Sequence, residues 1–142
     1  MDKNKVYVDP LNIVFAKAME ITTYIGLIIM VVFGLLYLFN LHSFVNMKVA
    51  VNNWHLPVST FWKEVKGVEI HGYHWFISNL PAMDCISEIG ICILALAPLA
   101  GLVSGLFKTK EQKIYTILFL ILIIEFLFAI LKPIILPGIG GH

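Results

Sequence analysis

The chain has 142 residues, of which 59% are hydrophobic and 13% charged, and its formal net charge at pH 7 is +1. Soluble domains are about half apolar and about a quarter charged, so this composition indicates an integral membrane protein with one domain, residues 1–142. The lysines form no basic stripe, so nucleic acid is excluded as an expected partner. The first expected partner is the lipid bilayer.

Three segments are apolar over the roughly 20 residues that a helix needs to cross a bilayer. They comprise residues 21–39, 85–107 and 114–131. The first helix is expected to start earlier, because Asp9 followed by Pro10 is a good N-cap and first-turn pair. Pro98 is expected to kink the second helix, since proline removes one helical hydrogen bond. The predicted fold is therefore all-α and integral to the membrane, with three transmembrane helices.

The placement of the lysines predicts the orientation of these helices. With three spans, the N-terminal segment and the short turn KTKEQK lie on the same side of the membrane. Each of them carries three lysines, whereas the longer connection 40–83 carries three and the C-terminal tail one. Short loops rich in lysine stay on the cytoplasmic side. We expect the cytoplasmic (inner) membrane of a prokaryote, with the N-terminus inside and the C-terminus outside.

The connection 40–83, between the first and second spans, is unusually rich in aromatic residues for a loop. Such side chains settle at the level of the lipid headgroups. The aromatic residues that define this belt are Trp54, Phe61, Trp62, Tyr73, Trp75 and Phe76. Apolar residues recur from Ile70 to Leu80 at spacings of three and four, which predicts a short interfacial helix before the second span.

Three histidines of this connection are candidate cofactor ligands: His42, His71 and His74. His71 and His74 stand at i and i+3 in the stretch HGYHWF, which places them on one face of the expected helix. Two imidazoles on one face can share an ion, with Asp84, Cys85 or His42 as further ligands. A haem near the outer surface is the other functional interpretation, and the metal itself stays unknown. The simpler interpretation is that the histidines are polar tips of the aromatic belt.

Glu125 lies inside the third apolar segment. A carboxylate near a helix centre costs about 2.5–3.5 kcal/mol to insert, and it usually faces a partner or a water-filled path. As a functional group it could accept a proton from a quinol. As a structural group it could be a neutral acid that fixes helix packing, bonded for example to Ser87. Both interpretations stay open.

Small residues indicate where helices approach one another closely. Ala97, Gly101 and Gly105 recur every four residues in the second apolar segment, and Gly26 with Thr22 repeats the pattern in the first. Such positions let a neighbouring backbone come near. We interpret them first as packing features.

The second and third apolar segments are similar to the helical hairpin of a domain-of-unknown-function family of short prokaryotic membrane proteins. The shared features are the helix from Gly90 to Pro98, the short charged turn, and the Lys113-Ile114-Tyr115 start of the last helix. The similarity covers residues 90–131. Members of that family are often encoded beside permeases of the sulfite-exporter type. This chain departs from the pattern by lacking an arginine after the proline and by having Glu125, so the resemblance implies a three-span accessory protein and assigns no functional residues.

The leading functional hypothesis is a small, non-catalytic subunit of a multi-subunit membrane complex of the respiratory or electron-transfer type. No GxSxG motif, phosphate loop or CxxCH motif is present, and little chain lies outside the predicted spans, so catalysis by this chain alone is not expected. A haem or quinone shared with larger membrane subunits would be framed by His42, His71, His74 and Glu125. The alternative is an accessory, docking subunit of an anion permease without a cofactor.

Overall fold

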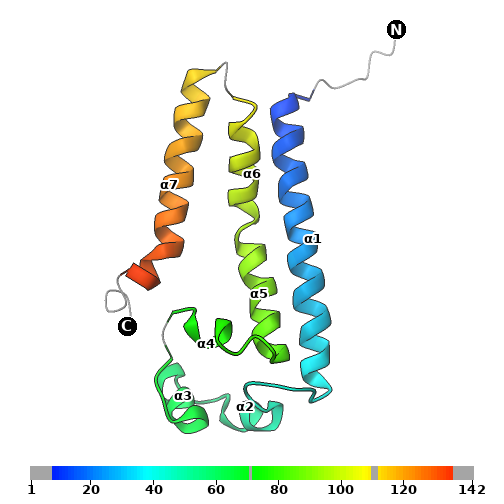
Figure 1. Ribbon diagram of the computed structural model, residues 1–142, viewed down its shortest axis with the longest axis vertical. Helices are drawn as coiled ribbons and strands as arrows, with labels where there is room; N and C mark the ends of the chain where they lie inside the picture. The colour runs from blue at the N-terminus through cyan, green and yellow to red at the C-terminus, as the bar shows by residue number, and fades with distance from the viewer. Residues whose placement is uncertain (1–7, 71, 110–111, 136–142) are drawn as a thin grey trace.

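The computed structural model describes residues 8–70, 72–109 and 112–135, and these residues form seven helices and no strand. Four helices are long or stacked end to end: α1 (Pro10–Leu38), α5 (Met83–Ala95), α6 (Ala97–Leu106) and α7 (Lys113–Ile135). Three are short: α2 (Met47–Asn53), α3 (Val58–Lys66) and α4 (His74–Ile77). Figure 1 shows α5 and α6 in line beside α1, α7 on their other side, and the short helices gathered at one end.

Two helices, α1 and α7, are each long and apolar enough to cross a membrane. The pair formed by α5 and α6 passes the same test together, with a bend of 40° between its halves. The bend lies at Leu96, directly before Ala97 and Pro98, where the missing proline N–H was expected to kink the helix. The all-α membrane architecture is thus confirmed.

The ends of the two long helices follow from local chemistry. The helix α1 begins at Pro10, and the Asp9 carboxylate accepts a hydrogen bond of 2.8 Å from the Leu11 N–H, which confirms the predicted cap. The helix α7 runs through Pro133 to Ile135, beyond the predicted end at residue 131. A proline in the last turn removes a single hydrogen bond and leaves the preceding turns intact.

The prediction of one interfacial helix over residues 70–80 was wrong in extent. The helix α4 has only four residues and starts at His74. Gly72 has a φ of +62°, and this left-handed conformation interrupts any helix between positions 71 and 74. The helices α2 and α3 were not predicted from the sequence. The latter ends at Gly67, whose φ of +71° is that of a glycine C-cap.

The helices α1 and α5 touch through their backbones at Gly26 and Gly90. A Cβ atom on Gly90 would lie 2.5 Å from the Met30 nitrogen and 2.8 Å from the Gly26 carbonyl oxygen. One turn away, the Ser87 hydroxyl donates a hydrogen bond of 3.1 Å to the Met30 carbonyl oxygen. Between membrane helices, close packing and polar contacts of this kind replace the hydrophobic driving force.

The small residues of α6 receive large side chains from its two neighbours. A Cβ atom on Gly101 would lie 2.8 Å from Cγ of Met19 in α1, and one on Gly105 would meet the ring of Phe119 in α7. Ala97, Gly101 and Gly105 are all buried. The expectation that these positions let helices approach closely is confirmed, and both neighbours belong to this chain.

Asp84, in the first turn of α5, holds the chain that follows α1. Its two carboxylate oxygens accept hydrogen bonds of 2.8 Å from the N–H groups of Phe44 and Val45. The Met83 N–H donates a bond of 2.9 Å to the His42 carbonyl oxygen beside them. Charged acceptors make stronger hydrogen bonds than neutral ones, so residues 42–45 are fixed on the start of α5.

Aromatic rings extend this attachment to the short helices. Trp75 is central: its ring centroid lies 5.8 Å from that of Phe44, 5.3 Å from that of Trp62 and 5.4 Å from that of Phe76. The Lys66 ammonium sits 3.9 Å from the Phe44 ring centroid. Such contacts are each worth up to about 1 kcal/mol beyond the area they bury. These ring contacts join α3 and α4 to the N-terminal end of α5.

We predict that Gly90→Ala destabilises the protein whereas Gly34→Ala does not. Both changes gain about 1 kcal/mol of helix propensity. At Gly90 the new methyl group meets the α1 backbone, and such overpacking costs about 1–3 kcal/mol. At Gly34 it lies 3.5 Å from the Ser87 hydroxyl, an ordinary contact. Thermal unfolding in one detergent, followed by tryptophan fluorescence, measures both variants, and equal midpoints would contradict the close contact.

We also predict that Asp84→Ala exposes the Phe44 and Val45 amides to hydrogen exchange. Hydrogen bonds to charged groups contribute about 1.5–3 kcal/mol each. Asp84→Asn keeps one good acceptor, so its exchange rate falls between those of the wild type and Asp84→Ala. Exchange measured by mass spectrometry over residues 40–46 tests this order, and a peptide inside α1 serves as the control. Unchanged rates in Asp84→Ala would show that the carboxylate does not hold this segment.

Candidate functional site

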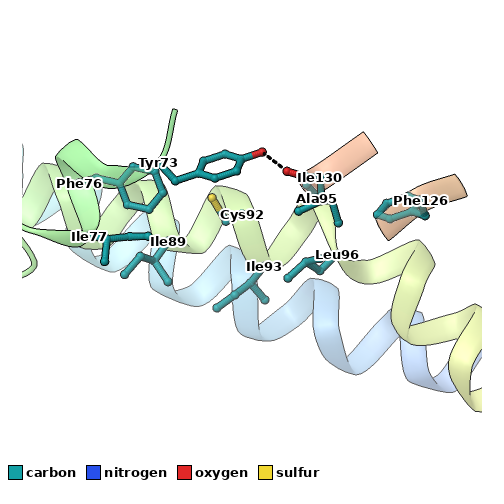
Figure 2. A pocket seen from close by; sticks show the side chains of 10 residues that line it. All are labelled: Tyr73, Phe76, Ile77, Ile89, Cys92, Ile93, Ala95, Leu96, Phe126 and Ile130. Carbon is teal, nitrogen blue, oxygen red and sulfur yellow. Dashed lines mark hydrogen bonds between the residues drawn. The ribbon is translucent and has the colours of Figure 1, made fainter. Parts of the chain in front are cut away.

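An apolar cavity of about 410 Å³ lies between α4, α5 and α7. Figure 2 shows the side chains that line it, among them Tyr73 and Phe76 around α4, Cys92 on α5, and Phe126 and Ile130 on α7. Among the lining residues that the structure describes, the Tyr73 hydroxyl and the Cys92 thiol are the only polar side-chain groups. Small-molecule sites have volumes of about 300–1,000 Å³ and are mostly apolar with few polar groups. The cavity fits that description.

The cavity follows from how the long helices pair. The helix α5 packs on α1, whereas α7 packs on α6, and the bend at Leu96 separates these two contacts. The Tyr73 hydroxyl donates a hydrogen bond of 3.3 Å to the Ile130 carbonyl oxygen, across the space between them (Figure 2). This bond joins the aromatic connection to α7 at the edge of the cavity.

The described histidines lie outside the cavity. His42 and His74 are exposed, and the Ser78 hydroxyl lies 3.2 Å from both ring nitrogens of His74. His71 lies outside the described residues. The described parts of the chain contain no group of three or more His, Cys, Asp or Glu side chains that could hold a metal ion. The structure therefore does not assemble a complete ligand set from the residues that it describes.

The two further ligands considered from the sequence, Asp84 and Cys85, have other roles. The Asp84 oxygens accept hydrogen bonds from backbone N–H groups. The Cys85 side chain is fully buried and packs with Phe76 and Ala82 in the core under α4. These contacts are structural ones between the start of α5 and the segments packed on it.

Glu125 is exposed on α7, a helix with no buried residue in the described chain. Its carboxyl group has no hydrogen bond or ion pair with the described residues. The Ser87 hydroxyl, suggested from the sequence as its partner, is bonded to α1 instead. Successive helical residues are rotated by about 100°, so Glu125 and its neighbour Phe126 point in different directions. Phe126 faces the cavity, and Glu125 faces the outside of the molecule.

A family model described as AF1633-like membrane protein matches residues 2–138. The chain belongs to this family. The match confirms the predicted resemblance to a family of prokaryotic membrane proteins and extends it from the hairpin to nearly the whole chain. With two helices able to cross a bilayer, the chain is a multi-pass membrane protein, and lipid surrounds its apolar outer faces.

Two relatives from Archaeoglobus fulgidus, both described as uncharacterized proteins, are similar to the chain. One is 30% identical over 138 residues, which are 97% of this chain and 60% of the relative. The chain thus spans about 60% of the length of that relative. The other is 39% identical over 126 residues, which are 89% of this chain and 91% of the relative. No solved structure matches the chain.

The cavity was not predicted from the sequence, because its walls come from three separated segments. Tyr73 and Ile130 are 57 residues apart, and neither belongs to a recognisable motif. The single local signal was Pro98, which predicts the bend but not the space beside it.

Proposed function

We propose that this chain is a small, non-catalytic subunit of a multi-subunit membrane complex of the electron-transfer type. The observation that carries the proposal is the exposed Glu125 carboxyl group in the middle of an apolar helix. Exposing such a group to lipid costs about 2.5–3.5 kcal/mol, which a neighbouring helix with a cation or a proton donor removes. A larger membrane subunit on this face of α7 is our proposed source of that cation or proton donor.

The surface around Glu125 is suited to packing against another helix. Residues on the same face of α7, at spacings of three, four and seven from Glu125, are Leu118, Ile121, Leu122, Phe128, Ala129 and Lys132. All of them are exposed, and the first four are large and apolar. We call this surface, centred on Glu125, the Glu125 face. A partner helix here covers apolar side chains and the acid together.

The proposed topology has three spans, formed by α1, by the bent pair α5 and α6, and by α7. The start of α1 and the turn between α6 and α7 lie at one end of the molecule, and the aromatic connection with α2, α3 and α4 lies at the other (Figure 1). The exposed lysines Lys17, Lys108 and Lys113 belong to the first end, and Lys48, Lys63 and Lys66 are exposed in the longer aromatic connection. Since lysines in short segments determine orientation, the first three support the N-terminus inside and the aromatic connection on the outer side.

The electron-transfer assignment rests on side chains at the outer end. His42 and His74 are exposed there, on the same half of the molecule as the second half of α7. A haem or a quinone at this end is shared with the larger subunit, which supplies the remaining contacts. Imidazole is a common haem and metal ligand, and Glu125 can exchange a proton with a quinol.

One observation favours the second candidate, an accessory subunit of an anion permease without a cofactor. The His74 ring contacts the Ser78 hydroxyl, and its neighbour Trp75 packs among aromatic rings. These contacts are those of residues in an interfacial aromatic belt. In this case the Glu125 face docks onto the permease.

We predict that Glu125→Leu weakens the retention of a larger membrane subunit by about tenfold or more, since losing a buried charge contact costs over 1.4 kcal/mol. The chain is purified through an affinity tag in mild detergent, and its partners are quantified by mass spectrometry. Ile124→Ala, a change of the adjacent exposed side chain, is the control. Equal retention in both variants and the wild type would contradict docking through Glu125. A preparation that contains only copies of this chain would contradict a larger subunit and show self-association instead.

The spectrum of the same preparation separates the two candidate functions. A reduced-minus-oxidised haem signal that falls in His74→Ala supports the electron-transfer complex. A preparation without haem or quinone that contains a permease supports the docking subunit. The wild type and His74→Ala are compared at equal amounts of partner, so that a loss of signal is not a loss of assembly.

The proposed orientation predicts opposite labelling of two exposed positions. In a background without Cys85 and Cys92, Asn52→Cys is expected to react with a membrane-impermeant maleimide in intact cells. Gln112→Cys is expected to react only after permeabilisation, and its substitution leaves the lysines in place. The reverse pattern would overturn the orientation.

A further inference from the structure

We propose that the cavity between α4, α5 and α7 binds the hydrocarbon chain of a membrane amphiphile, either an acyl or an isoprenoid chain. The inference goes beyond docking through Glu125 because it uses another face of α7 and a separate observation. The cavity has a volume of about 410 Å³ and is lined by α5 on one side and by Phe126 and Ile130 of α7 on the other. Tyr73 and Phe76 close the side that faces the aromatic connection.

Water does not suit this cavity. The cavity is open on one side, since Ile77, Ala95 and Leu96 among its lining residues are exposed, and its apolar lining cannot supply the roughly three hydrogen bonds that a bound water makes. The Tyr73 hydroxyl hydrogen is already donated to the Ile130 carbonyl oxygen, and the Cys92 thiol is a weak donor and acceptor. An empty cavity is also unfavourable, because its lining atoms lose dispersion contacts. A hydrocarbon chain supplies those contacts without needing polar partners.

The surroundings indicate where such a chain comes from and how it lies. The cavity is beside α5 and α7, at the depth of helices whose outer faces meet lipid, so hydrocarbon reaches it from the bilayer. The exposed polar side chains of His74 and Ser78 lie at the α4 side. The headgroup of the amphiphile therefore lies on the α4 side, and its chain extends between α5 and α7.

Selectivity over bulk lipid has to come from shape. Lipid tails are as apolar as leucine, so moving a chain from the bilayer into the cavity gains little from the hydrophobic effect. The gain comes from a preformed space with aromatic walls and from the Tyr73–Ile130 bond that fixes α7 relative to α4. A side chain that fills the space therefore abolishes binding, even when it is apolar.

The test uses the full chain in detergent with a photoreactive palmitic acid that carries a diazirine in its chain. After irradiation, adducts are mapped by peptide mass spectrometry. We expect adducts at residues 89–96 and 126–130 in the wild type, and a decrease of about tenfold in Cys92→Phe, which fills the cavity. Ile91→Phe adds the same ring on a neighbouring residue of α5 that does not line the cavity and keeps the wild-type adducts.

A second cavity-filling variant, Ala95→Phe, distinguishes a loss of binding from a folding defect caused by Cys92→Phe. Ala95 lines the cavity and is exposed, so a larger side chain there does not enter the core. The expected result is the same loss of adducts, in a variant that elutes as the wild type does in size-exclusion chromatography. Adducts that are equal in all variants, or spread evenly over the lipid-facing helices, would show annular lipid only and overturn the proposal.

Competition identifies the source of the chain. Excess phospholipid that removes the adducts assigns the cavity to a membrane lipid. Excess of a benzoquinone with a decyl tail that removes them, where phospholipid does not, assigns it to a lipid-soluble redox carrier. Adducts that neither competitor reduces are non-specific and overturn the proposal. None of these outcomes depends on a partner at Glu125, so the two proposals fail or succeed separately.

Discussion

The contact between Gly26 and Gly90 determines where most of the chain can lie. Each glycine stands where any Cβ atom would meet the backbone of the other helix, so α1 and α5 approach as closely as two helices can. Lipid offers no hydrophobic force to bring two apolar helices together, and such a contact gains its stability from packing and from the Ser87–Met30 hydrogen bond. The position of α5 on α1 is therefore determined by Gly26 and Gly90, which have no side chain to keep the two backbones apart.

The outer layer of short helices depends on that position. The start of α5 carries Asp84, whose carboxylate accepts hydrogen bonds from backbone N–H groups just after α1. These bonds attach the beginning of the connection 40–83 to α5, the helix that follows this connection. The aromatic rings around Trp75 then bring α3 and α4 against the same end. Beyond the hydrogen bonds inside its short helices, this layer is attached to α5 by the Asp84 carboxylate, by the bond from Met83 to His42 and by a group of rings.

The sequence predicted the features that are encoded locally. Asp9 and Pro10 start a helix, Pro98 bends one, and glycines spaced by four residues receive neighbouring side chains, and each of these signals lies within one or two helical turns. The features that it did not predict join distant segments. Asp84 accepts hydrogen bonds from Val45 and Phe44, which precede it by 39 and 40 positions, and the Tyr73–Ile130 bond joins residues 57 positions apart. The expected helix over residues 70–80 was wrong in extent for a local reason, the left-handed Gly72, which spacing alone does not reveal.

The bend before Pro98 also explains why α7 has two unequal neighbours. Its first half packs on α6, where Gly105 admits Phe119, whereas beside α5 the cavity intervenes and Tyr73 provides the bond to Ile130. The position of the second half of α7 thus depends on few contacts within the chain. A hydrocarbon chain in the cavity and a partner on the Glu125 face would each stabilise that position from a different side. By thermodynamic linkage, two ligands that favour the same position of one helix favour each other's binding.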